Sequence, residues 1–136
     1  MALVKFDHVN IQTGNLAAMS AFYDQVLGLP AGYRPPFGFA GAWHYCGDTA
    51  VVHLVETPHR PDAVGNPQLE HFALQANGMA AFLDRLRENG VAYRIAVVPE
   101  IEVRQVNLHD PDGNHIHIDF GPDEEADLSD FDGGTN

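Results

Sequence analysis

Cysteine, cationic side chains and long apolar runs are all scarce in this sequence. Cys46 is the only cysteine, which excludes an internal disulfide and fits a reducing compartment. No apolar run approaches the roughly 20 residues that span a bilayer, and no signal-peptide pattern opens the sequence. We therefore expect a cytoplasmic protein that does not bind or cross a membrane.

Positive charge is also scarce, and negative charge is concentrated at one end. The sequence has 7 Lys and Arg against 19 Asp and Glu, for a formal net charge of −12. Six carboxylates lie between Asp123 and Asp132, and no Lys or Arg follows Arg104. Such a balance argues against nucleic acid or an anionic membrane as a partner. Residues 122–136 are predicted to form a solvated, disordered acidic tail.

One predicted strand near the C-terminus carries an unusual set of polar side chains. It follows the turn sequence Asp-Pro-Asp-Gly at 110–113, and residues 115–120 then alternate strictly between polar and apolar side chains. His115, His117 and Asp119 share one face of this strand. The opposite, apolar face is predicted to pack against a helix, so the polar face points into a polar space.

The same alternation recurs in three other segments, each with a histidine opposite bulky apolar residues. The polar positions are His8, Asn10 and Gln12 in residues 6–12, His53 in residues 50–55, and His71 and Gln75 in residues 69–75. Four strands are therefore predicted to present a histidine on one face of a sheet.

The order of predicted elements repeats once along the chain. The first half has a strand at 4–12, a helix capped near Thr13 or Asn15 and stopped by Gly28, a short strand at 31–34, and a hairpin of 41–46 and 49–56. The second half has a strand at 69–76, a helix ended by Asn89-Gly90, and strands at 92–97, 102–108 and 115–120. Residues 21–34 align without gaps on residues 81–94. We infer an internal duplication.

The duplication predicts an α+β fold of two βαβββ modules. The modules are residues 1–57 and 69–121, joined by a linker at 58–68. Because one helix covers only one face of four strands, the uncovered polar faces are predicted to curve into an eight-stranded cup. A twofold relation would bring His8 together with His71, and His53 together with His117. Four imidazoles that converge in a shielded space favour a divalent transition metal.

The remaining histidines lack this symmetry. His59 in the linker and His109 at a strand end are predicted to be surface residues. His115 is predicted to contact substrate or to lie around the metal site. The position of His44 depends on the hairpin register, because a three-residue loop would turn its two aromatic neighbours toward the His53 face instead.

The chain resembles the vicinal oxygen chelate superfamily over residues 3–121. This superfamily includes glyoxalase I, fosfomycin- and bleomycin-resistance proteins, methylmalonyl-CoA epimerase and extradiol dioxygenases. The resemblance is carried by Asp-His-Val-Asn-Ile at 7–11, Ala-Phe-Tyr-Asp-Gln-Val-Leu-Gly-Leu at 21–29, Glu-His-Phe-Ala-Leu at 70–74, Asn-Gly-Val at 89–91 and Asp-Pro-Asp-Gly-Asn at 110–114. It implies paired βαβββ modules that form a cup around one metal ion.

The resemblance implies metal ligands at His8, His71 and His117, with His53 at a position that ligates in glyoxalase I-like members. The chain departs from the family at two of these positions. Glutamate is the usual residue at the position of His117, and glyoxalase I has glutamate at the position of His53. Four neutral imidazoles strengthen the Lewis acidity of the ion and suit Zn, Ni or Fe(II) better than Mg or Mn. We expect one such ion per site. Asp119 is the predicted catalytic base, with ionised metal-bound water as the alternative.

We expect a metal-dependent lyase or isomerase that chelates a small substrate through neighbouring oxygens. Two alternatives stay open: an Fe(II) dioxygenase, and a metal-free binding or resistance protein. The predicted substrate-binding residues are Arg34, Phe37, Phe39, Asn10, Gln12, Gln75, Gln105, Asn107 and His115. Unpaired strand edges at the rims of the cups predict a homodimer, and the sequence leaves open whether its modules are exchanged between chains.

Overall fold

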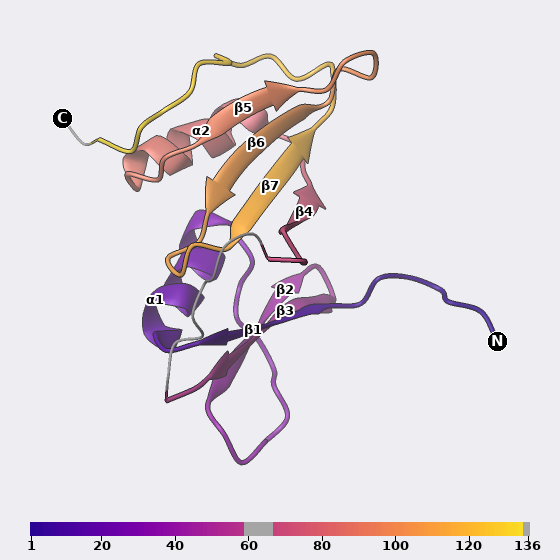
Figure 1. Ribbon diagram of the computed structural model, residues 1–136, viewed down its shortest axis with the longest axis vertical. Coiled ribbons are helices and arrows are strands. Elements are labelled where there is room, and N and C mark those ends of the chain that lie inside the picture. The colour runs from indigo at the N-terminus through magenta and orange to yellow at the C-terminus, as the bar shows by residue number, and fades with distance from the viewer. Residues whose placement is uncertain (59–66, 135–136) are drawn as a thin grey trace. The chain divides into compact units, whose positions relative to one another are not determined.

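The computed structural model describes residues 1–58 and 67–134 of the chain (Figure 1). The chain divides into two compact units, Met1–Val64 and Gly65–Asn136. The predicted linker at 58–68 falls mostly outside the described residues, and so does the surface position predicted for His59. Within the described part of the chain, no helix has the length and apolar character needed to cross a bilayer.

The first unit is a three-stranded mixed sheet with one helical segment. Its strands are β1 (Val9–Thr13), β2 (Gly41–Cys46) and β3 (Thr49–Glu56), in the order β1-β3-β2. Helix α1 (Leu16–Ala21) follows β1 and continues as a π-helical turn, η1 (Phe22–Val26). The Asn15 side chain accepts a hydrogen bond from the Ala18 amide at 3.3 Å, and Gly28 has a φ of 72°. Both predicted helix signals are confirmed.

The second unit is a four-stranded mixed sheet in the order β4-β7-β6-β5. Its strands are β4 (His71–Gln75), β5 (Arg94–Val97), β6 (Arg104–His109) and β7 (His115–Phe120), and α2 (Met79–Glu88) follows β4. The predicted turn at 110–113 is present, because the Gly113 amide donates to the Asp110 carbonyl at 2.9 Å. The α+β class predicted from the sequence is confirmed.

The two sheets share one strand register, as a duplicated unit requires. In the first sheet, His53 of β3 pairs with Asn10 of β1 and with Trp43 of β2. In the second, His117 of β7 pairs with Ala73 of β4 and with Asn107 of β6. The sequence spacing between Asn10 and Ala73 equals that between His8 and His71. The spacing between Trp43 and Asn107 likewise equals that between His53 and His117. The repeat seen in the letters therefore extends to the hydrogen-bonded pairs.

Each sheet buries its apolar face, whereas its histidine face varies in exposure, from the exposed His71 to the buried His117. In the first unit, Val52 and Leu54 of β3 are buried, whereas His53 between them is half-buried. In the second unit, Ile116 and Phe120 of β7 are buried, and the Phe120 ring lies 5.8 Å from that of Phe82 on α2. The period of two in the sequence has therefore placed the apolar residues in the core, as predicted.

Two elements of the first unit are shorter than predicted. The strand expected at 31–34 is reduced to a single bridge between Ala31 and His44. Pro30 precedes this bridge and two prolines follow at 35 and 36, so the backbone lacks amide donors on both sides. The first strand begins at Val9 rather than at residue 4, which leaves His8 immediately before β1.

The acidic C-terminal segment corrects the prediction of a disordered tail. Residues 122–134 run along the second unit (Figure 1). The Glu124 carboxylate accepts hydrogen bonds from the amides of Gly78 at 3.1 Å and Met79 at 3.0 Å, at the N-terminus of α2. Composition predicts solvation, but here a negative charge meets free amide groups and the positive end of a helix dipole.

A second anchor holds the same segment against β5. Phe131 and Tyr93 exchange two backbone hydrogen bonds, of 2.9 and 3.0 Å, and their ring centroids lie 5.8 Å apart. The Asp130 carboxylate accepts from the Ile95 amide at 2.9 Å and lies 3.3 Å from the Arg94 guanidinium. Leu128 and Phe131, the two large apolar residues of this segment, are too few to predict docking, but these backbone and charge contacts offset the entropy of ordering.

Candidate metal centre

The polar face of the second sheet gathers three histidines where β4 and β7 begin. His71 pairs with His115 across these parallel strands, and His117 follows on the same face of β7. The His71 ring centroid lies 5.1 Å from that of His115 and 4.5 Å from that of His117. His71 is exposed, His115 is half-buried and His117 is only 8% exposed. The predicted alternation thus creates a cluster of imidazoles with graded access to solvent.

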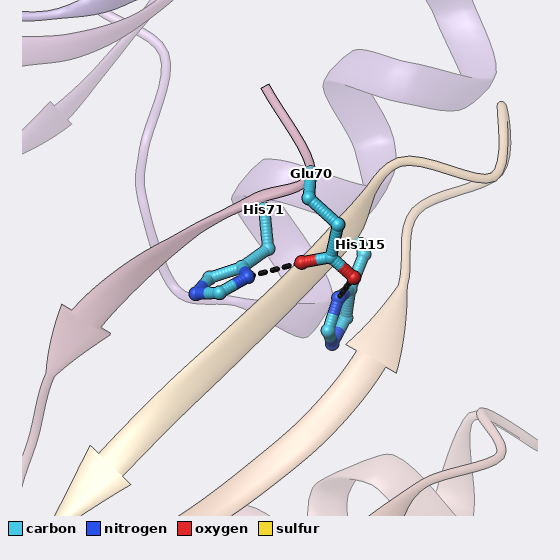
Figure 2. A group of neighbouring side chains, drawn as sticks. All are labelled: Glu70, His71 and His115. Carbon is cyan, nitrogen blue, oxygen red and sulfur yellow. Dashed lines mark hydrogen bonds and ion pairs between the residues drawn. The ribbon is translucent and has the colours of Figure 1, made fainter. Parts of the chain in front are cut away.

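Glu70 connects two of these histidines (Figure 2). One carboxylate oxygen is hydrogen-bonded to His71 Nδ1, and the other lies 3.0 Å from His115 Nδ1. The hydrogen bonds from His71 and then from His115 hold the pKa of the Glu70 carboxyl below its usual value. Ligand atoms of the three residues lie within 4.8 Å of one another. Sequence reasoning missed Glu70, although it directly precedes a predicted ligand.

Asn107, a predicted substrate-binding residue, contacts His115, and Gln105, another, contacts Asn107 through its main-chain carbonyl. His115 Nε2 lies 2.8 Å from the Asn107 side-chain oxygen, and the Asn107 amide group donates to the Gln105 main-chain carbonyl at 3.3 Å. His115 is therefore held at both ring nitrogens, by Glu70 and by Asn107. Because both of its nitrogens are engaged, His115 suits the surroundings of a metal better than direct coordination.

The predicted base Asp119 contacts a predicted ligand. Its carboxylate accepts a hydrogen bond of 2.6 Å from His117 Nδ1. The two residues share the polar face of β7, and Gln75 of β4 pairs in register with Asp119. Gln75 is exposed, as are Asn10 and Gln12 of β1 in the other unit. These three predicted substrate-binding residues lie on polar strand faces as expected. Their contact with substrate stays a prediction.

In the first unit, the two predicted ligands stack on each other. The rings of His8 and His53 are 3.8 Å apart and nearly parallel, and Trp43 stacks on His53 at 3.9 Å. The Asp7 carboxylate accepts a 2.6 Å hydrogen bond from His8 Nδ1, which lowers the pKa of the Asp7 carboxyl. His53 Nε2 donates to the Ala50 carbonyl at 3.0 Å. Burial, and then the neighbouring His8, lower the pKa of His53.

The hairpin register left open by the sequence places Trp43 on the His53 face and His44 in the core. A register shift between His44 and Tyr45 accompanies the two-residue turn. His44 is fully buried, where its Nδ1 donates to the Leu29 carbonyl at 2.7 Å and its Nε2 lies 2.9 Å from the Ser20 hydroxyl. His44 is therefore a structural histidine that links β2 to the helical segment.

The predicted substrate-binding residues Arg34, Phe37 and Phe39 extend the row of rings in the first unit. The Arg34 guanidinium carbon lies 4.9 Å from the Phe37 centroid and 5.1 Å from that of Phe39. Phe37 lies 5.3 Å from Phe39 and 6.0 Å from Trp43. Five rings in sequence, from Phe39 through Phe37, Trp43 and His53 to His8, form what we call the ring column. It offers partly exposed aromatic rings beside a cation.

The donor groups fit a divalent transition metal. In the described part of the chain, the hydrogen bonds of His8, His71 and His117 all use Nδ1. Each ring therefore keeps a second nitrogen for a ligand, and imidazole nitrogen is a preferred donor for Zn, Ni and Fe(II). Two predicted ligands belong to each unit. Their convergence on one ion stays a prediction.

Comparisons with known proteins agree with these features. Residues 5–118 match the model of the Glyoxalase/Bleomycin resistance protein/Dioxygenase superfamily. Glyoxylase I 4 of Arabidopsis thaliana is 33% identical over 124 residues, which cover 85% of this chain and 70% of that protein. A glyoxalase/dioxygenase from Nostoc punctiforme has a TM-score of 0.72 at 21% identity, covering 88% of this chain and 92% of that chain. The lactoylglutathione lyase from Agrobacterium tumefaciens has a TM-score of 0.67 at 20% identity, covering 90% and 97%.

Proposed function

Because the chain belongs to the Glyoxalase/Bleomycin resistance protein/Dioxygenase superfamily, we propose that it is a metal-dependent lyase or isomerase of the vicinal oxygen chelate type. The ligands would be His8, His71 and His117, with His53 as a fourth. A bound Zn, Ni or Fe(II) ion would supply Lewis acidity toward a substrate that carries two neighbouring oxygens. The observation that carries this proposal is that the hydrogen bonds of His8, His71 and His117 all use Nδ1, which leaves Nε2 for a metal.

The residues around the imidazoles support a role in binding a planar or partly apolar substrate. The ring column offers stacking surface, and Arg34 adds a positive charge at its outer end. Asn107 contacts His115 and is itself held by the main-chain carbonyl of Gln105. These residues would orient a substrate against the metal-binding histidines, which is how positioning lowers a reaction barrier.

Metal analysis followed by a substrate screen tests the proposal. Protein purified without chelator should contain close to one transition-metal ion per chain and should turn over an α-oxoaldehyde, rather than only bind it. His71→Ala should abolish both properties. His109→Ala is the comparison variant: it removes an exposed imidazole at the end of β6 that stacks on His115 but is not a predicted ligand, so metal should be retained. Metal-free wild-type protein that still binds small molecules would instead favour the binding or resistance alternative.

One observation favours a second function, an Fe(II) dioxygenase. Glu70, His71 and His115 combine two histidines with one carboxylate within 4.8 Å, a donor set used by non-haem Fe(II) oxygenases. Oxygen uptake with a catechol, measured on anaerobically Fe(II)-loaded protein, distinguishes this function. Turnover without oxygen uptake would exclude it.

We also propose that the protein acts as a cytoplasmic homodimer. Phe6 and Leu69 immediately precede the histidine strands at equivalent positions of the repeat, and they are 80% and 89% exposed. Large exposed apolar side chains beside strand edges are suited to pairing with another copy. Sedimentation should show a dimer at micromolar concentration, and Phe6→Ser with Leu69→Ser should weaken it. A monomeric wild-type protein would contradict this proposal.

A further inference from the structure

Three of the four predicted ligands share one kind of partner. His8 Nδ1 donates to Asp7 at 2.6 Å, and His117 Nδ1 donates to Asp119 at 2.6 Å. His71 Nδ1 is hydrogen-bonded to Glu70 in the same way. In each pair the imidazole presents Nδ1 to a carboxylate, and the carboxylate is a near neighbour in sequence.

The chemistry of these pairs fixes which ring nitrogen is available to a metal. An ionised carboxylate can only accept a hydrogen bond, so the proton must reside on Nδ1. A neutral imidazole protonated at Nδ1 has its lone pair on Nε2. The carboxylate also prevents the ring from rotating, because rotation would break the hydrogen bond. Each pair therefore presents an Nε2 donor in a fixed direction.

Carboxylate partners set the three predicted ligands apart from the core histidine and from His53, although Glu70 also reaches His115 Nδ1 with its other oxygen. Asp7 and Glu70 occupy equivalent positions of the repeat, each directly before its histidine. By contrast, the buried core histidine, His44, is held by a backbone carbonyl and a hydroxyl. Within the described residues, His53 has no carboxylate partner and donates Nε2 to the Ala50 carbonyl. The arrangement therefore separates His8, His71 and His117 from His53, and His115 differs from these three because its Nε2 is also engaged, by Asn107.

We propose, building on the metal-dependent function above, that Asp7, Glu70 and Asp119 are positioning residues. They hold His8, His71 and His117 in the Nδ1-protonated form, so that Nε2 coordinates the ion. Asp119 is then not the catalytic base that the sequence favours, and Glu70 is not itself a ligand. A carboxylate behind a metal-binding imidazole raises its basicity and fixes its orientation, and its loss commonly costs 10–100-fold in metal affinity.

Direct coordination by Glu70 fits the contacts less well. Coordination of one ion by both Glu70 and His71 Nδ1 would require Nδ1 to lose the proton that it donates to Glu70 in a hydrogen bond. His115, the third member of that group, is engaged at Nε2 by Asn107 as well. Coordination through Nε2 of His71 and His117 requires neither change.

Long-range ¹H–¹⁵N NMR of the histidine rings tests the proposal on the intact protein. Without metal, His8, His71 and His117 should each show the proton on Nδ1. After zinc is added, the ¹⁵N shift of Nε2 should move in all three rings, whereas Nδ1 should keep its proton. Protonation at Nε2 in the metal-free protein, or zinc bound at Nδ1, would overturn the proposal.

Zinc affinity of carboxylate variants provides an independent measure. Asp7→Asn, Glu70→Gln and Asp119→Asn should each lower zinc affinity about 10–100-fold, while the melting temperature of the metal-free protein stays near that of wild type. Asp48→Asn is the matched control, because Asp48 is an exposed carboxylate in the β2–β3 turn. Unchanged zinc affinity in all three variants would overturn the positioning role.

Failure of the metal-dependent function and failure of the positioning role would give different results. If His71→Ala retains zinc with wild-type affinity, the metal-dependent function itself is wrong. If His71→Ala loses zinc but the three carboxylate variants retain it, the function stands and only the positioning role is wrong. Loss of zinc in Glu70→Gln alone, with zinc at His71 Nδ1, would make Glu70 a ligand.

Discussion

The two units place equivalent histidines in different surroundings. His53 in the first sheet pairs with Trp43 and lies between two stacked rings. His117 in the second sheet pairs with Asn107 and donates to a carboxylate. Since the registers around these histidines agree, the strand pairing is the same in both units at these positions while the side chains differ. The first unit presents a stack of rings, and the second presents a charged and hydrogen-bonded cluster.

One feature common to both units stands out against this divergence. A carboxylate directly precedes the first-strand histidine in each, as Asp7 before His8 and as Glu70 before His71, and it binds Nδ1 of that histidine. The last-strand histidines differ, because among the described residues a carboxylate accepts a hydrogen bond from His117 but not from His53. The comparison therefore predicts that His8 and His71 act alike and that His53 and His117 do not.

The largest expected effect separates His117 from His53. His117→Ala should remove most of the bound metal, because loss of a ligand costs several kcal/mol of a total on the order of 10 kcal/mol or more. His53→Ala should cost much less, since three ligands with water form a viable catalytic set. Zinc titration of the two variants checks this, and equal losses would show that the two positions are functionally equivalent.

A smaller effect concerns the segment that only the second unit has. Glu124→Ala should lower the free energy of unfolding by about 1 kcal/mol, because the carboxylate satisfies two amides at the start of α2. Urea denaturation followed by circular dichroism measures the change. Glu125→Ala, at an exposed neighbouring carboxylate, should leave stability near wild type. Equal stability of both variants would mean that the segment does not cap the helix.

The smallest effect concerns the titration of His53. Burial lowers its pKa in the folded chain, so the unfolded chain binds this proton at higher pH, near the ordinary value of about 6.5. The stability contributed by neutral His53 is thus complete above that value and declines as pH falls through it. Trp43→Ala should expose the ring and raise its pKa, as NMR titration would show. An unchanged or lower pKa would contradict the role of the stacked indole.

Local patterns in the sequence predicted much of each unit. Asn15 and Gly28 could be predicted as the two ends of the first helical segment, because helix capping and left-handed backbone are local effects. The alternation around His117 likewise fixed which face carries it. Asp119 lies two residues farther along β7, and its side chain closes the gap to 2.6 Å from the His117 ring. That contact depends on side-chain rotamers, which spacing alone does not determine.

Other features depend on contacts that no local pattern encodes. Glu70 lies just before β4, at a position that the alternation assigns to the face opposite His71, so only the pairing of β4 with β7 brings it to His115. The register shift beside His44 decides that Trp43 faces His53. Glu124 reaches α2 across more than 40 residues of sequence, and composition alone favoured a free tail.

Zinc stoichiometry in His8→Ala and His71→Ala tests most directly whether the two units supply one metal site. Calorimetric titration of wild-type protein should give one zinc ion per chain. Both variants should lose that ion to a similar degree, although the substituted histidines belong to different units. Two ions per wild-type chain, or full zinc affinity in His8→Ala, would contradict a single site built from both repeats.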